Sequence, residues 1–156
     1  MRPGEVLVHA TAVASAEYCI LITGPSGSGK SDLALRLIGV PPSGLQLPPF
    51  SLVSDDQVLL AREGEHLIAR PPATIAGRME VRGLGLLDMP YTDSAQVRLI
   101  IQLTAPDEVT RMPEPATQTL AAMIVPVIPL YPFEPSAPLK AALALRAHLP
   151  PALSRA

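Results

Sequence analysis

The chain has 156 residues, of which 48% are apolar and 3% aromatic, and its formal net charge is −2 with a pI of about 5.9. This length predicts one domain, residues 1–156, with enough chain for a hydrophobic core. The small negative charge argues against nucleic acid and against an anionic membrane surface as partners, and no apolar run reaches the ~20 residues of a bilayer span. The N-terminus lacks a signal-peptide pattern, so we expect a cytoplasmic protein.

The first half of the chain predicts strands around one short helix. Residues 5–15 and 17–23 have strand character, the second run being continuously apolar, as in a strand that is buried on both faces. Its single Cys19 is expected to be a buried, unreactive thiol. Apolar residues spaced four apart predict a helix over residues 31–38, and the proline-rich residues 41–50 end it.

The second half predicts further strands and a terminal helix. The expected elements are two strands on either side of an acidic pair (50–63), a hairpin partner (65–71), a short strand-turn segment (79–89), a strand (96–104), proline-rich loops or strand ends (112–138) and an amphipathic helix (137–150). Strands outnumber helices and their order is mixed. We therefore predict an α/β fold with a mixed β-sheet flanked by helices.

The strongest motif lies between the second strand and the first helix. Residues 24–31 read GPSGSGKS and fit the pattern G-x-x-x-x-G-K-[ST]. Glycines let backbone N–H groups approach phosphate oxygens, and the helix N-terminus adds its unpaired donors and its dipole. A glycine-rich turn with an exposed lysine is the alternative, but the strand before and the helix after favour phosphate binding. We therefore expect the α/β fold to be a P-loop nucleotide-binding domain. The predicted nucleotide-binding residues are Gly24, Pro25, Ser26, Gly27, Ser28, Gly29, Lys30 and Ser31.

Two segments add carboxylates. Asp55 and Asp56 follow a short apolar strand, where one acid could bind Mg²⁺ and another could accept a proton from a hydroxyl. Neighbouring side chains on an extended strand point to opposite sides, so we expect the two acids to differ in role. Glu80, in MEVRGLGLLDM, is either a Mg²⁺ ligand or part of a cross-strand ion pair beside a glycine bulge. His9 is flanked by apolar residues, and a structural role is the default for such a histidine.

Taken together, HATAVA, ITGPSGSGKSDLAL, LVSDDQV and MEVRGLGLLDM resemble HPr kinase/phosphorylase, in particular the short form that consists of its C-terminal catalytic domain. The loop and the stretch EVRGLG carry most of this resemblance, which covers most of residues 5–90 and, more weakly, 104–130. Members of that family transfer phosphate from ATP, or in some members pyrophosphate, to a serine of HPr, a carrier protein of the sugar phosphotransferase system. Many members also reverse the reaction with inorganic phosphate.

The resemblance implies a role for each matching residue. It makes the chain an ATP- and Mg²⁺-dependent serine kinase in which residues 24–31 hold the nucleotide, and Ser31 and Glu80 hold the metal. One acid of the pair Asp55 and Asp56 becomes the catalytic base, with a preference for Asp56. The implied partners are HPr or an HPr-like phosphocarrier and further copies of the chain, in a hexamer.

The resemblance implies two more catalytic residues, and the chain also departs from the family pattern at several positions. His9 matches the histidine ahead of the P-loop, and Arg111 matches a catalytic arginine; an ordinary solvated arginine is the alternative at that position. Asp32 replaces the usual glutamate, and residues 41–50 are inserted. Residues 125–138 replace a stretch similar to RPGRN, and they contain no arginine, which argues against efficient reversal and against the usual hexamer contacts.

Two other functions fit a P-loop. A small-metabolite kinase would share the loop, but such enzymes close over their substrates with arginine-rich lids, and the later loops of this chain hold few arginines. A module that senses nucleotide without catalysis would need only the loop itself.

Overall fold

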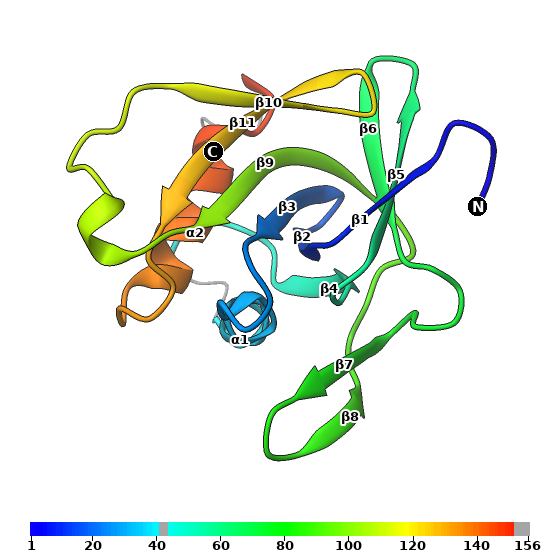
Figure 1. Ribbon diagram of the computed structural model, residues 1–156, viewed down its shortest axis with the longest axis horizontal. Coiled ribbons are helices and arrows are strands. Elements are labelled where there is room, and N and C mark those ends of the chain that lie inside the picture. Colours follow the sequence, from blue (N-terminus) through cyan, green and yellow to red (C-terminus); the bar gives the residue numbers. More distant parts are fainter. Residues whose placement is uncertain (41–43, 152–156) are drawn as a thin grey trace.

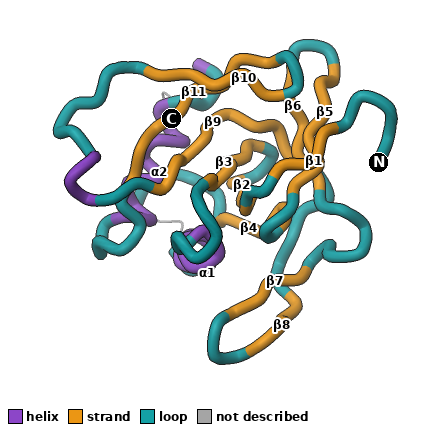
Figure 2. Tube along the Cα trace, viewed as in Figure 1, coloured by secondary structure: helices purple, strands orange, loops and turns teal. Residues whose placement is uncertain are grey.

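The computed structural model describes residues 1–40 and 44–151, and it consists of a strongly curled mixed sheet with two helices and a projecting hairpin (Figure 1; Figure 2). The elements are β1 (Val6–Val8), β2 (Thr11–Ser15), β3 (Tyr18–Thr23), α1 (Lys30–Ile38), β4 (Phe50–Ser54), β5 (Val58–Glu63), β6 (His66–Arg70), β7 (Arg78–Val81), β8 (Gly85–Asp88), β9 (Ala95–Leu103), the 3₁₀ turn η1 (Pro106–Glu108), β10 (Ala116–Leu120), β11 (Met123–Leu130) and α2 (Ala137–Ala147).

The main sheet has the order β1-β5-β6-β9-β3-β2-β4, and the β10–β11 hairpin joins it at β9. Strands β3, β9 and β11 run parallel to one another, and the other pairings are antiparallel. The predicted mixed sheet is therefore confirmed. The carboxyl ends of the three parallel strands meet at one edge, where ligands bind in open α/β sheets.

The two faces of the sheet are covered in different ways. Both helices pack on one face, where Leu33 and Leu37 of α1 and Leu145 of α2 are fully buried against alternate residues of β3 and β9. The other face holds no helix residue in its core, because the curl of the sheet brings β5 and β6 over β2 and β3. Cys19 is buried in this second core, and burial raises the pKa of its thiol, as expected for an unreactive cysteine.

The predicted strand over residues 5–15 is divided in two. Strand β1 pairs with β5 at one edge of the main sheet, and β2 pairs with β3 and β4 at the opposite end of the strand order. The break falls at His9 and Ala10, so one continuous strand was the wrong prediction. A single straight strand cannot pair with neighbours at both ends of a curled sheet.

The proline-rich segment 112–138 is the second correction, because it contains two full strands. Pro126 lies where β11 pairs only with β10, and Pro129 lies where β11 pairs only with β9. A proline cannot donate a ladder hydrogen bond, so it is tolerated where one side of its strand is unpaired. The predicted terminal helix corresponds to α2, and the hairpin partner over residues 65–71 corresponds to β6.

The β7–β8 hairpin is a separate two-stranded sheet that projects from the body below α1 in Figure 1. Met79 anchors it in the helix-side core, whereas Leu84 at its tip is 72% exposed. Its base is tied to β4, since Leu52 N donates to Pro90 O at 2.9 Å and Thr92 N donates to Leu52 O at 2.9 Å. These contacts hold β7 next to the end of β4.

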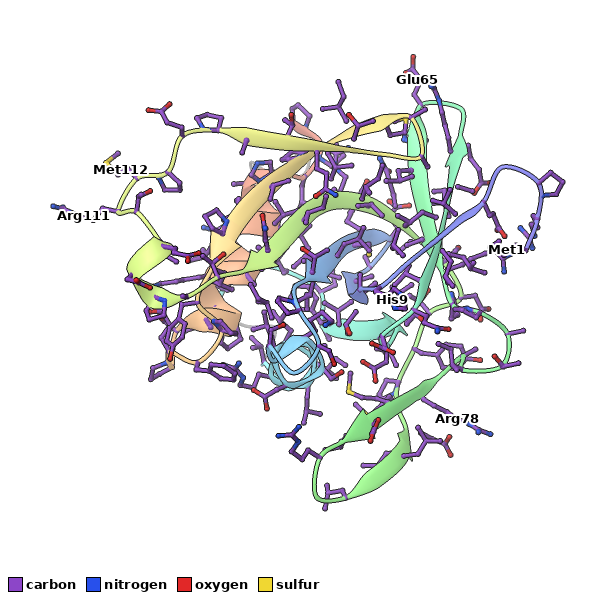
Figure 3. The ribbon with its side chains drawn as sticks, in the orientation of Figure 1. Met1, His9, Glu65, Arg78, Arg111 and Met112 are labelled. Atoms are coloured by element: carbon purple, nitrogen blue, oxygen red, sulfur yellow. The ribbon has the colours of Figure 1, made fainter. Side chains whose placement is uncertain are left out.

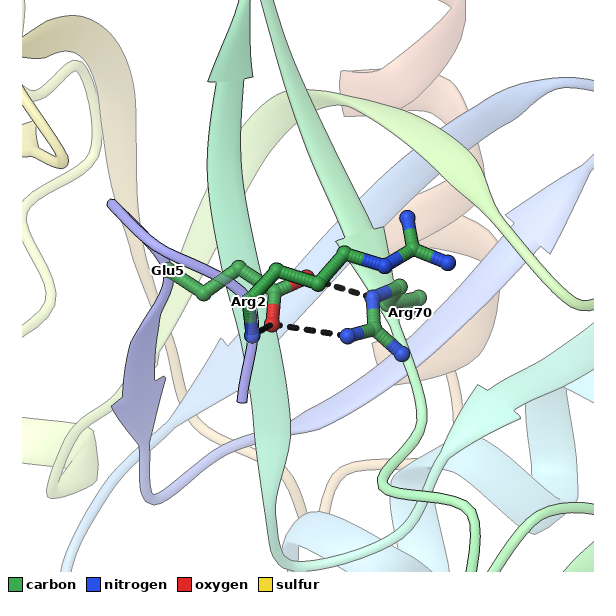
Figure 4. A network of polar contacts seen from close by, with 3 residues as sticks. All are labelled: Arg2, Glu5 and Arg70. Atoms are coloured by element: carbon green, nitrogen blue, oxygen red, sulfur yellow. Dashed lines mark hydrogen bonds and ion pairs between the residues drawn. The ribbon is translucent and has the colours of Figure 1, made fainter.

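The N-terminus is anchored by an ion pair (Figure 4). Arg70 Nε and Nη2 donate to Glu5 Oε1 and Oε2 at 2.5 and 2.7 Å, and the backbone N of Arg2 donates to Glu5 Oε2 at 2.7 Å. The Arg70 hydrogen bonds, helped by the Arg2 backbone, lower the pKa of Glu5 to about 2.

Within residues 1–40 and 44–151, neither helix has the length and apolar character needed to cross a bilayer.

Candidate nucleotide-binding and phosphoryl-transfer site

The glycine-rich loop joins the end of β3 to the start of α1, and it has no room for a side chain at two of its glycines, Gly24 and Gly29. A Cβ on Gly24 would lie 2.6 Å from Ser28 Oγ, and a Cβ on Gly29 would lie 2.9 Å from Cζ of Phe133. Gly29 also has a φ of +103°, in the region that favours glycine. The loop is therefore a close-packed backbone cradle, which explains why the sequence places glycine at these positions.

Donors in the loop are available for an anion. Lys30 is only 8% exposed, and its Nζ folds back to donate to the carbonyls of Gly24 and Pro25 at 2.9 and 3.1 Å. Ser28 Oγ is buried and has no hydrogen-bond partner in the part of the chain that the structure describes. Gly29 caps α1 without a side-chain hydrogen bond, so the first N–H groups of the helix lack a capping acceptor. The Lys30 ammonium, the Ser28 hydroxyl and the first N–H groups of α1 are donors of the kind that bind the phosphates of a nucleotide.

Asp55 is the residue that joins the loop to the rest of the site. It follows β4 and is buried, with 9% exposure. Its Oδ1 accepts hydrogen bonds from Ser31 Oγ at 2.5 Å and from Thr11 Oγ1 at 3.1 Å, and its Oδ2 accepts one from the Glu80 backbone N at 3.2 Å. One carboxylate therefore connects α1, β2 and β7.

Asp56 has a different setting. It is exposed, has a φ of +66°, and forms the centre of a three-residue γ-turn in which Gln57 N donates to Asp55 O at 2.8 Å. Thr11 Oγ1 accepts the Asp56 N–H at 3.2 Å, and Ser54 Oγ donates to Gln57 O at 2.5 Å. The two acids therefore differ in burial, and the cause is this turn, because Asp56 does not have the extended backbone that was expected. Strained turns of this kind are concentrated at functional sites.

The site could hold a metal ion only with help from a ligand. No cluster of three or more His, Cys, Asp and Glu suited to a metal occurs within residues 1–40 and 44–151. Ser31 and the backbone of Glu80 both contact Asp55, so a hydroxyl and two carboxyl-bearing residues lie together. Mg²⁺ is commonly bound in this way, by one or two carboxylates together with phosphate oxygens and water.

The remaining two candidate residues lie outside this network. His9 is exposed in the link between β1 and β2, two residues before Thr11, and its side chain has no hydrogen bond in the described chain. Arg111 is exposed in the loop between η1 and β10, where it points outward at the edge of the molecule, well apart from His9 in Figure 3. The ordered network does not bring Arg111 to the acids.

Thr11 was not singled out from the sequence, although it contacts both acids. It is fully buried in a strand of small apolar residues, TAVAS, where a threonine is unremarkable as a β-branched residue. The proximity of Thr11 to the acids becomes evident only from the β2–β4 pairing, which places the start of β2 beside the end of β4.

Comparisons with known proteins identify one family. The family model of the HPr serine kinase C-terminal domain matches residues 4–128. The HPr kinase/phosphorylase of Limosilactobacillus reuteri is 32% identical over 133 residues, which cover 78% of this chain and 39% of that protein. The same enzyme of Mycoplasmopsis pulmonis is 39% identical over 85 residues, covering 54% of this chain and 25% of that protein.

A solved structure, the Hpr(Ser) kinase/phosphatase from Coxiella burnetii, is similar over almost the whole chain. It superposes with a TM-score of 0.76 at 27% identity and covers 92% of this chain and 95% of that one. The chain spans between a quarter and two fifths of the length of the two curated relatives named above. By the match over residues 4–128, the chain belongs to the HPr serine kinase C-terminal domain family.

Proposed function

We propose that this chain is an ATP- and Mg²⁺-dependent kinase domain that phosphorylates a serine of HPr or of an HPr-like phosphocarrier. The observation that carries the proposal is the contact of Asp55 with Ser31 and with the Glu80 backbone. It unites a phosphate cradle with an acidic pair at one edge of the sheet, which is the combination that phosphoryl transfer needs. Family membership supplies the substrate class.

The loop would hold the phosphates of ATP. Lys30 would exchange its two carbonyl acceptors for β- and γ-phosphate oxygens, and the α1 N–H groups and Ser28 Oγ would donate to the same chain of phosphates. Ser31 and Glu80 would hold Mg²⁺, with Asp55 beside them as a direct or water-mediated partner. When bound, the ion supplies charge neutralisation on the transferred phosphate.

Asp56 is the better candidate for the catalytic base. Asp55 is buried and already accepts three hydrogen bonds, whereas the Asp56 carboxylate is exposed and has no partner in the described chain. A base must reach the proton of an incoming hydroxyl, and an exposed carboxylate on a rigid turn meets that requirement. His9 and Arg111 remain proposed catalytic residues, and Arg111 would have to approach when substrate binds.

The reverse reaction and the assembly are further predictions. Residues 125–138 comprise most of β11, the turn after it and the first two residues of α2, and they contain no arginine that could bind a free phosphate ion. We therefore expect kinase activity without efficient phosphate-dependent release. A cytoplasmic location and an assembly of several copies also remain predictions.

The test is transfer of label from γ-labelled ATP with Mg²⁺ to purified HPr. We expect label on a serine of HPr with the wild-type chain, and transfer about 10²–10³-fold slower with Lys30→Ala. Label on a small metabolite, or tight nucleotide binding with no transfer to HPr, would refute the proposal in favour of a metabolite kinase or of a nucleotide sensor.

A further inference from the structure

The position of the acids sets the direction in which a bound nucleotide runs. This step rests on the proposed function, in which the transferred phosphate lies at Asp55 and Asp56. Both acids follow β4, at one end of the order β4-β2-β3-β9, and β11 lies beyond β9. An extended nucleotide with its last phosphate on the β4 side carries its base on the opposite side of the loop, toward the ends of β9 and β11.

An exposed aromatic ring lies on that opposite side. Phe133 follows β11, and its ring borders the loop, since a Cβ on Gly29 would lie 2.9 Å from its Cζ and 3.1 Å from its Cε1. The side chain nevertheless remains 57% exposed, whereas Phe50, the other phenylalanine of the chain, is buried in the core. The ring therefore touches the phosphate cradle with one edge and leaves a large part of its surface free.

One contact holds the ring of Phe133, and a second contact holds the turn that carries it. Tyr131 packs against it edge to face, with ring centroids 5.9 Å apart and an interplanar angle of 79°. Arg36 of α1 donates a hydrogen bond to the carbonyl of Pro132, which is itself buried. The turn that carries Phe133 is thus attached to the same helix whose N-terminus completes the loop, and a ligand would meet a ring already in position.

We propose that Phe133 is the platform on which the base of the nucleotide stacks. Aromatic side chains bind nucleobases by offset stacking, with little dependence on which base is present, because every base has a π-face. The platform would add affinity for a nucleotide over a phosphate chain without a base. It would also couple base binding to the loop through the contact with Gly29.

The experiment measures binding of Mg-ATP and of Mg-tripolyphosphate, which has no base, by calorimetry. We expect Phe133→Ala to weaken Mg-ATP binding by roughly 5- to 150-fold, the range found when base-stacking aromatics are truncated, and to leave Mg-tripolyphosphate binding unchanged. Phe133→Tyr should retain Mg-ATP binding. Ile124→Ala removes an apolar side chain that is 72% exposed at the other end of β11 and serves as the matched control.

Two results for Phe133→Ala would refute the stacking role while leaving the proposed function intact. The first is an equal loss of binding for both ligands, which would indicate a structural role beside the loop. The second is unchanged binding of both ligands. Tight and equal binding of the two ligands by the wild-type chain would also overturn the stacking role while leaving phosphate binding intact. Binding of neither ligand by the wild-type chain would refute the proposed function and this inference together.

Discussion

The two acids allow a paired prediction, because the structure gives them different surroundings. Asp56→Asn removes the proposed base while keeping a residue that tolerates the φ of +66°. The Asp56 side chain is exposed and forms no hydrogen bond in the described chain, so the free energy of unfolding should change by no more than about 0.5 kcal/mol. Loss of a general base should lower kcat by roughly 10²- to 10⁴-fold, or about 3–5 kcal/mol in the barrier.

Asp55→Asn should act on metal-nucleotide binding. Its carboxylate accepts hydrogen bonds from Ser31 Oγ, Thr11 Oγ1 and the Glu80 N–H. An asparagine can keep the Glu80 bond through its oxygen, but its amide then faces the two hydroxyls as a donor, and the charge is lost. The variant would also lose the charge-assisted contact that Asp55 is proposed to make to the bound ion, directly or through water. A hydrogen bond to a charged group is worth about 1.5–3 kcal/mol, so the Kd of Mg-ATP should rise by roughly 10- to 150-fold.

The assay is transfer of label to HPr at several Mg-ATP concentrations, with Kd measured separately by calorimetry and stability by urea unfolding. The expected pattern is a kcat defect at normal Kd for Asp56→Asn and a Kd defect for Asp55→Asn. A normal kcat in Asp56→Asn, or similar mild losses in both variants, would refute the assignment of the base. An unfolded Asp55→Asn protein would show that the carboxylate serves stability.

Three further predictions concern other residues. Lys30→Ala should lower the transfer rate by about 10²–10³-fold with an unchanged circular dichroism spectrum, since it removes a preorganised donor; normal transfer would exclude the loop from the mechanism. Thr11→Val keeps the shape of the buried side chain but removes its hydrogen bonds to Asp55 and Asp56. The free energy of unfolding should therefore fall by about 1.5–3 kcal/mol, and activity should fall with it. Full activity in a folded variant would show that Thr11 does not position the acids. Glu5→Gln tests the N-terminal ion pair, because the pKa of Glu5 is lowered from 4.5 to about 2 by Arg70. A lowered pKa stabilises the fold above about pH 4.5, and this contribution disappears as the pH falls toward 2, so the wild-type advantage in urea unfolding should shrink over that interval; a constant difference from pH 6 to pH 2 would show that Glu5 carries no such charge effect.

Residue pattern alone identified the loop, because its spacing encodes local chemistry: a strand, a backbone turn that only glycine permits and a helix N-terminus follow one another within residues 18–38. The helices at 30–38 and 137–147 and the β5–β6 hairpin also depend on short-range periodicity, and they were predicted correctly. The strand break at His9 and the two strands in the proline-rich segment were not, since both depend on which neighbours a strand meets in the curled sheet.

Only the tertiary structure decided which of the two acids is buried and which residues lie around the loop and the acids. Asp55 and Asp56 are adjacent and chemically identical in the sequence, and only the turn after β4 buries one and exposes the other. Thr11 and Phe133 carry no local signal, because their contacts come from residues 44 and 104 positions away along the chain. Local spacing determines a glycine-rich turn of the kind that can bind phosphate, but long-range strand pairing must assemble the residues that surround it.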